Sequence, residues 1–183
     1  MRFFVLLLLL VCSTRSIAND DDIDTVFIVF SNHLDVGYTD NNNGSSSGAV
    51  INRYFDTHFP NAQKLGNVSF SEGFQYKWMT HSWLVDVYLN CKDTIVNIYG
   101  PGSKSDLNCP TEEQLSAFES AVRSESITYH AFPFNAEPEM YNAELFEASL
   151  NITFALDDYF GLPRKRSLSQ RDVPGLVRCC CVE

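Results

Sequence analysis

Residues 25–30 read TVFIVF, a short continuous apolar run, and His33-Leu34-Asp35 follows shortly after it. A run of this length, rich in β-branched and aromatic residues, predicts a strand buried on both faces, as in a parallel sheet. If the backbone stays extended beyond the run, side chains two residues apart point to the same side. His33 and Asp35 are therefore expected to project together at the carboxyl end of this strand, where α/β folds place their chemistry.

Further strand and helix patterns alternate along the rest of the chain. Expected strands cover residues 75–80, 126–132 and 167–170, and expected helices cover residues 49–65, 83–89, 111–123 and 139–160. Pro60 interrupts the first helical pattern, whereas Thr111 and Gln114 have the spacing of a capping box at the start of the third. This alternation predicts βαβ units and a parallel sheet, either an open doubly wound sheet or the beginning of a barrel.

The length of the chain bears on the choice between these two architectures. A closed β/α barrel takes about 250 residues, and this chain has 183. Any barrel that this chain forms is therefore unfinished, and both architectures stay open on these observations. Residues 179–183 read CCCVE where an amphipathic helix is due, and we interpret this as the aberrant tail of a truncated product.

The first 18 residues have the pattern of a secretory signal peptide. Arg2 supplies the positive start, residues 3–11 form an apolar stretch, and small residues lead to Ala18. The apolar stretch is too short to span about 30 Å of bilayer hydrocarbon as a helix. The mature protein is therefore expected to be secreted or lumenal, without a membrane anchor.

Charge and modification signals agree with a secreted protein. The formal net charge is −10 at pH 7, which disfavours nucleic acid as a partner because such binding needs basic surfaces. Acceptor triplets for N-linked glycans begin at Asn43, Asn67 and Asn151. Cys91 and Cys109 bracket a turn-rich segment, and an oxidising compartment favours a disulfide between them.

Polar residues follow each of the expected strands. His81 follows the second strand, His130 follows the third, and Asp172 follows the fourth. Carboxyl ends of parallel strands line a ligand site, so His81 and His130 are candidates for contact with substrate. The alternatives are hydrogen-bonded core histidines, and for Asp172 a turn residue before Pro174.

Two of these stretches resemble the N-terminal domain of glycoside hydrolase family 38, the α-mannosidases, or a divergent related branch. The family's first motif is His-x-Asp followed by Pro-Gly-Trp, and residues 33–38 read HLDVGY, with Tyr38 in place of the tryptophan. A later Asp-Pro-Phe-Gly motif has its nearest counterpart in residues 172–175, DVPG. The resemblance implies that His33, Asp35 and Asp172 bind one zinc ion.

The same resemblance implies a fold, a reaction and a substrate. Residues 19–178 would form a partial N-terminal catalytic domain, the first part of an irregular β/α barrel. Asp172 would act as the nucleophile of a retaining glycosidase, with a second carboxyl group as acid and base. The family's fourth zinc ligand is a later histidine, and no histidine follows Asp172 here; the acid/base carboxylate is also expected beyond residue 183. Tyr38, His81 and His130 are the candidates for sugar contact.

We therefore expect the N-terminal fragment of a secreted, zinc-dependent glycoside hydrolase that acts on carbohydrate and is inactive alone. One alternative keeps the zinc and changes the reaction, because polysaccharide deacetylases also use His and Asp ligands at strand ends. Another alternative is a secreted carbohydrate-binding fragment without catalysis. Released sugar, released acetate and chelation-resistant sugar binding distinguish the three hypotheses.

Overall fold

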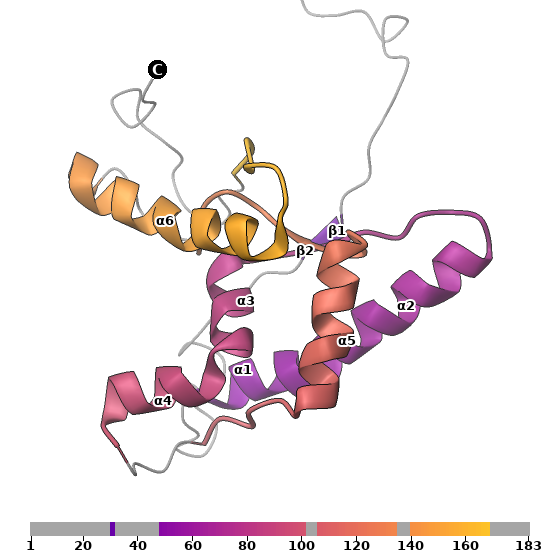
Figure 1. Cartoon of the computed structure of the whole chain (residues 1–183), viewed down its shortest axis with the longest axis horizontal. Coiled ribbons are helices and arrows are strands. Elements are labelled where there is room, and N and C mark those ends of the chain that lie inside the picture. The colour runs from indigo at the N-terminus through magenta and orange to yellow at the C-terminus, as the bar shows by residue number, and fades with distance from the viewer. Residues whose placement is uncertain (1–29, 32–47, 102–105, 135–139, 169–183) are drawn as a thin grey trace, which may run out of the picture.

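The computed structural model describes residues 30–31, 48–101, 106–134 and 140–168 (Figure 1). Short strands alternate with helices throughout these ranges. Their order is β1 (Phe30–Ser31), α1 (Gly48–Arg53), the π-helical turn η2 (Tyr54–His58), α2 (Phe59–Ser71), β2 (Trp78–Thr80), α3 (Ser82–Leu89), α4 (Cys91–Tyr99), α5 (Glu112–Arg123), β3 (Ile127–Tyr129) and α6 (Ala143–Phe160).

The strands form one parallel sheet in the order β1-β2-β3. Phe30 pairs with Trp78, and Ser31 pairs with Met79. On the other side of β2, Met79 pairs with Thr128. Parallel neighbours need crossover connections, and helices lie in each described connection. Because the described strands run in the same direction, their carboxyl ends lie at the same edge of the sheet.

The described strands are shorter than the sequence patterns indicate. β2 occupies only the last three residues of the expected strand over 75–80, and β3 ends three residues before the end of the one over 126–132. After β3 the chain bends rather than continuing in the ladder. Residues 167–168 are irregular, and residues 25–29 and 169–170 lie outside the described ranges.

The first helical region is longer than expected and passes through Pro60. Helical structure runs without interruption through α1, η2 and α2, where the sequence predicted a break at Pro60. The backbone N–H of Phe59 donates to the carbonyl of Tyr54, which is the wider π-helical spacing. Pro60 then lies in the first turn of α2, where a missing N–H is tolerated. The expected break at Pro60 is wrong for this reason.

Helix α5 begins as the sequence predicts. The hydroxyl of Thr111 accepts from the backbone N–H of Gln114, and the side-chain oxygen of Gln114 accepts from the backbone N–H of Thr111. This reciprocal pair satisfies two backbone donors that a helix start leaves open. The capping box is thereby confirmed.

Helix α6 begins later than the expected start at residue 139. The side chain of Asn142 accepts from the backbone N–H of Leu145 and caps the helix, which ends at Gly161 with a φ of 67°. A left-handed residue after the last turn is the usual site for glycine.

Among the described helices, none is both long enough and apolar enough to cross a membrane.

Helix α4 lies in the segment that the sequence analysis treated as turn-rich. It occupies the first half of the stretch between Cys91 and Cys109, and these two cysteines form the disulfide expected from the sequence, with Cα atoms 5.5 Å apart. The backbone N–H of Asn108 donates to the side chain of Asn52 in α1. The disulfide and this hydrogen bond attach the segment after α4 to the helical layer.

One face of the sheet is covered and the other is more open. Trp78, Ile127 and Tyr129 lie on one face and are at most 9% exposed. Met79 and Thr128 alternate with them in the strands and are only half-buried. The pleat of a strand sends successive side chains to opposite faces. The core therefore lies on the face that carries Trp78.

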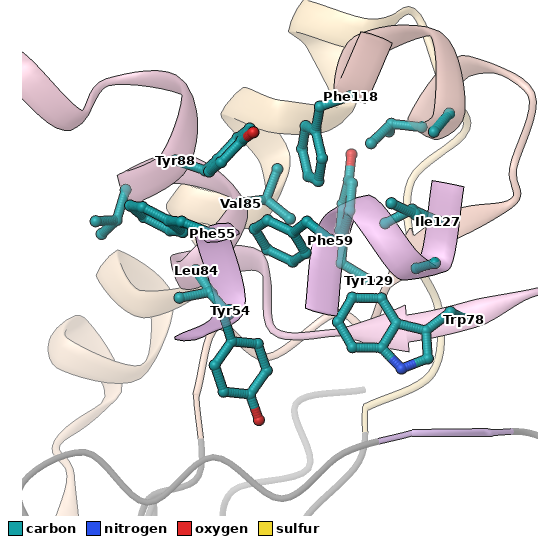
Figure 2. Packing of buried hydrophobic residues seen from close by; sticks show 14 of the residues in the cluster. Tyr54, Phe55, Phe59, Trp78, Leu84, Val85, Tyr88, Phe118, Ile127 and Tyr129 are labelled. Atoms are coloured by element: carbon teal, nitrogen blue, oxygen red, sulfur yellow. The ribbon is translucent and has the colours of Figure 1, made fainter. Parts of the chain in front are cut away.

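Among the described helices, η2, α2, α3, α5 and α6 contribute aromatic side chains to this core, most of which Figure 2 labels. Phe59 of α2 is central and fully buried, with ring centroids 5.7 Å from Trp78, 5.0 Å from Tyr88 of α3 and 4.7 Å from Phe118 of α5. Edge-to-face and tilted contacts of this kind add to the area buried. The helices that pack on the sheet through these contacts thus lie on a single side of it.

Candidate functional site

The candidate site is the edge of the sheet at which the parallel strands end. Of the proposed ligand-binding residues, His81 and His130 lie within the described ranges. His33, Asp35, Tyr38 and Asp172 lie outside them, as do Asn43, residues 1–18 and residues 179–183. The structure therefore bears directly on the part of the site that β2 and β3 contribute.

His81 and His130 directly follow β2 and β3 and lie side by side. Nε2 of His130 and Nδ1 of His81 are 3.2 Å apart, and the ring centroids are 4.9 Å apart with the planes nearly perpendicular. Both side chains are buried, at 3% and 4% exposure. One ring must donate to the other, so the hydrogen bond couples their protonation and tautomeric states. The sequence predicted two separate strand-end histidines, and the structure brings them into contact.

Polar contacts hold the residues that follow the two histidines. Ser82 directly follows His81, and its hydroxyl lies 2.6 Å from that of Thr153 in α6, with both side chains fully buried. The backbone N–H of Trp83 donates to the carbonyl of Pro133, which joins the start of α3 to the segment after β3. These contacts bind α3, α6 and the post-β3 segment together beside the histidine pair.

A buried carboxylate organises the same region and was missed in the sequence analysis. Asp157 of α6 is fully buried, and its two oxygens accept from the hydroxyl of Tyr129 at 3.0 Å and from the backbone N–H of Lys165 at 3.2 Å. Burial, and then the negative charge of Asp157 and this hydrogen bond, raise the pKa of the Tyr129 phenol. A signal was present, because Asp157 falls on the helical stripe with Thr153 and Phe160.

The chain returns to the sheet after α6. The backbone N–H of Ala131, two residues beyond β3, donates to the carbonyl of Ser167 at 2.8 Å. The contact of Asp157 with Lys165 fixes the path just before this point. Residues 167–168 thus lie next to the carboxyl end of β3, on the side away from β2.

The two described cavities lie away from this edge. The larger, of about 500 Å³, lies among α3, α5 and α6, where Asp86, Glu119 and Tyr159 contribute to its wall. The smaller, of about 160 Å³, lies beside the disulfide. Neither is lined by His81 or His130. Sugar contact by these two histidines remains a prediction.

A zinc site needs three or four donor side chains close together. The described ranges contain no cluster of three or more His, Cys, Asp or Glu side chains spaced for a metal ion. The proposed donors, one imidazole and two carboxylates, have the chemistry that catalytic zinc prefers. They belong to the stretches outside these ranges, so the zinc site remains a prediction from the sequence.

The two glycan acceptors within the described ranges both lie on helices. Asn67 is an exposed residue of α2, and Asn151 is an exposed residue of α6.

Comparison of the chain with models of protein families, with curated proteins and with solved structures found no match.

Proposed function

We propose that residues 19–178 form the first β/α units of a secreted, zinc-dependent retaining glycoside hydrolase of the α-mannosidase type. The topology of the described sheet supports this proposal. The described strands are parallel and neighbours in chain order, and the helices packed on them lie on one face. This order and one-sided packing fit the wall of a barrel, and also one half of a doubly wound sheet before its switch point. The sequence motifs favour the barrel.

The observation that carries the proposal is a row of histidines in the sheet register. Met79 pairs with Ser31 on one side and with Thr128 on the other. Each residue of this row is followed two positions later by a histidine, and these are His33, His81 and His130. The contact between His81 and His130 obeys the register. The proposal extends this register past Ser31, so that the HLD motif would lie at the same edge.

The zinc ligands in the proposal are His33, Asp35 and Asp172. The return of the chain beside Ala131 supports the third ligand, because Asp172 follows Ser167 closely in sequence. When bound, zinc supplies charge that polarises and orients adjacent sugar hydroxyls. In the proposal Asp172 attacks the anomeric carbon while the glycosidic carbon–oxygen bond breaks and the leaving oxygen takes a proton from an acid group. His81 and His130 are buried against each other at the same edge of the sheet. The acid/base group is not among these residues.

Metal binding by the full-length chain tests the proposal. Titration with Co²⁺, followed by its visible absorption, should show one tightly held ion that Zn²⁺ displaces. The substitutions H33A, D35N and D172N should each weaken binding by 10-fold or more, on the order expected for loss of a zinc ligand or its support. The matched control is H58A, because His58 is an exposed histidine of η2. Equal affinities for H33A and H58A would refute the site.

Sugar binding then separates the proposal from its rivals. Saturation-transfer NMR with methyl α-mannoside should show binding that needs zinc and disappears with EDTA. Binding that survives EDTA favours a non-catalytic carbohydrate-binding fragment, and acetate released from an acetylated polysaccharide favours a deacetylase. We expect no turnover of an aryl α-mannoside by this chain alone, because the proposal supplies no acid/base carboxyl group.

A further inference from the structure

The most exposed large apolar side chain in the described ranges is Phe70, at the end of α2. Its side chain is 86% exposed, and Phe74, just beyond the helix, is 57% exposed. Figure 1 shows the end of α2 extending away from the other helices. Leu65 and Val68 of the same helix are also exposed, at 49% and 43%. Exposed apolar side chains gathered in one region favour association between copies of the protein. Something that covers Phe70 would remove this tendency.

An acceptor asparagine lies beside Phe70 on the same helix. Asn67 is exposed and begins the triplet Asn67-Val68-Ser69. Residues three apart on an α-helix are surface neighbours, with Cβ atoms about 5–6 Å apart. A sugar attached to Asn67 would therefore start within reach of the Phe70 ring, whose faces are apolar and open to solvent.

We propose that Asn67 carries an N-linked glycan whose first sugar residue covers the ring of Phe70. The inference rests on the secreted location in the proposed function. The amide nitrogen of Asn67 attacks the anomeric carbon of a lipid-pyrophosphate-linked oligosaccharide. A nitrogen–carbon bond forms, the carbon–oxygen bond to the pyrophosphate breaks, and the amide releases one proton while the lipid pyrophosphate leaves.

The structure also assigns the order of modification and folding. Ser69, the hydroxyl residue of the triplet, is 2% exposed. Its hydroxyl donates to the carbonyl of Gly66 at 2.9 Å and accepts from the backbone N–H of Tyr76 at 3.0 Å. The triplet cannot present this hydroxyl to a transferase while α2 is formed. The glycan is therefore added before α2 folds.

A second acceptor provides an internal control with the same local pattern. Asn151 of α6 is exposed, and Phe154 follows it at the same spacing of three. The guanidinium of Arg164 lies over the Phe154 ring, 5.0 Å from its centroid. The aromatic neighbour of Asn151 is thus already covered by the protein. A glycan at Asn151 has no uncovered ring to protect.

The experiment expresses the full chain in insect cells and maps glycopeptides by mass spectrometry. We expect glycan at Asn67. The folded glycoprotein is then trimmed in two ways: an endoglycosidase leaves one N-acetylglucosamine on each asparagine, and an amidase removes the whole glycan. The first treatment should leave ANS fluorescence low, and the second should raise it together with the aggregated fraction in sedimentation.

Variants make the expected change specific. N67Q should behave like the fully deglycosylated protein, N151Q like the glycosylated one, and F70S should remove the difference between the two enzymatic treatments. An unmodified Asn67 overturns the inference. If Asn151 carries glycan in that case, secretory entry stands and the covering role alone fails. If both are bare, the proposed compartment fails as well. An equal rise in ANS signal after both treatments also refutes the cover of Phe70.

Discussion

Removing the hydroxyl of Tyr129 tests the buried contact that organises the carboxyl edge of the sheet. In Y129F, the fully buried Asp157 loses the donor at 3.0 Å and keeps only the more distant backbone N–H of Lys165. A hydrogen bond to a charged group contributes about 1.5–3 kcal/mol, and a buried acceptor left with fewer partners cannot turn to water. We expect Y129F to lower the free energy of unfolding by about this amount.

The chain provides a matched control at its surface. Tyr159 donates its hydroxyl to Glu119 at 2.7 Å, but Tyr159 is 54% exposed. Water replaces a lost partner there, so Y159F should cost less than about 1 kcal/mol. Both substitutions remove the same atom from a tyrosine–carboxylate pair. The comparison isolates the effect of burial.

Urea unfolding followed by circular dichroism measures the two free energies, and calorimetry gives the midpoints. For a chain of this length, about 2–4 °C of melting temperature corresponds to each kcal/mol. Y129F should melt about 3–12 °C below the unsubstituted protein, and Y159F within about 4 °C of it. Equal losses in the two variants, or a larger loss in Y159F, would refute the argument that burial makes the Asp157 contact the stronger one.

The remaining predictions concern pH, the disulfide and a helix cap. Burial raises the pKa of Tyr88 to about 12, and it also raises that of Tyr129. Unfolded tyrosines release their protons near pH 10 whereas these two retain them when folded, so stability should fall as pH rises above about 10. Reducing the Cys91–Cys109 bond, which spans 18 positions, should cost roughly 3 kcal/mol. T111A should cost about 1 kcal/mol through the lost cap.

Each of these has its own measurement and contrary outcome. Melting temperatures at pH 9 and pH 11, with absorbance at 295 nm, follow the tyrosines; a midpoint that does not change over this interval contradicts the pH argument. Melting with and without reductant tests the disulfide, and an unchanged midpoint opposes it. Thr111→Ser retains the hydroxyl and serves as the control for T111A. If both variants lose the same stability, the hydrogen bond of the cap is not the cause.

Local signals in the sequence predicted several elements well. The capping box at Thr111 was correct because both partners lie within one helical turn, so their contact needs no distant residue. The proposed Cys91–Cys109 pair also formed. Helix α4 was missed, because the turn residues around Gly100 led us to expect turns over the whole stretch between the two cysteines.

Errors occurred where one element depends on another. The strands expected over 75–80 and 126–132 were too long, because the pattern marks residues suited to a strand, whereas only those with a hydrogen-bonded neighbour form one. The expected break at Pro60 was wrong because the π-helical turn before it changes the hydrogen-bond spacing. Asp157 was overlooked, since a buried carboxylate is rare unless partners from other elements satisfy it.

The sequence by itself established the alternation of strands and helices, the cap of α5 and the presence of a histidine after each of two strands, because these are properties of neighbouring residues. Only the tertiary structure decided that His81 and His130 touch, that the helices packed on the sheet share one face, and that Asp157 joins β3 to the segment after α6. These facts depend on the register between strands and on packing between elements far apart in the chain. Local propensity carries no information about either.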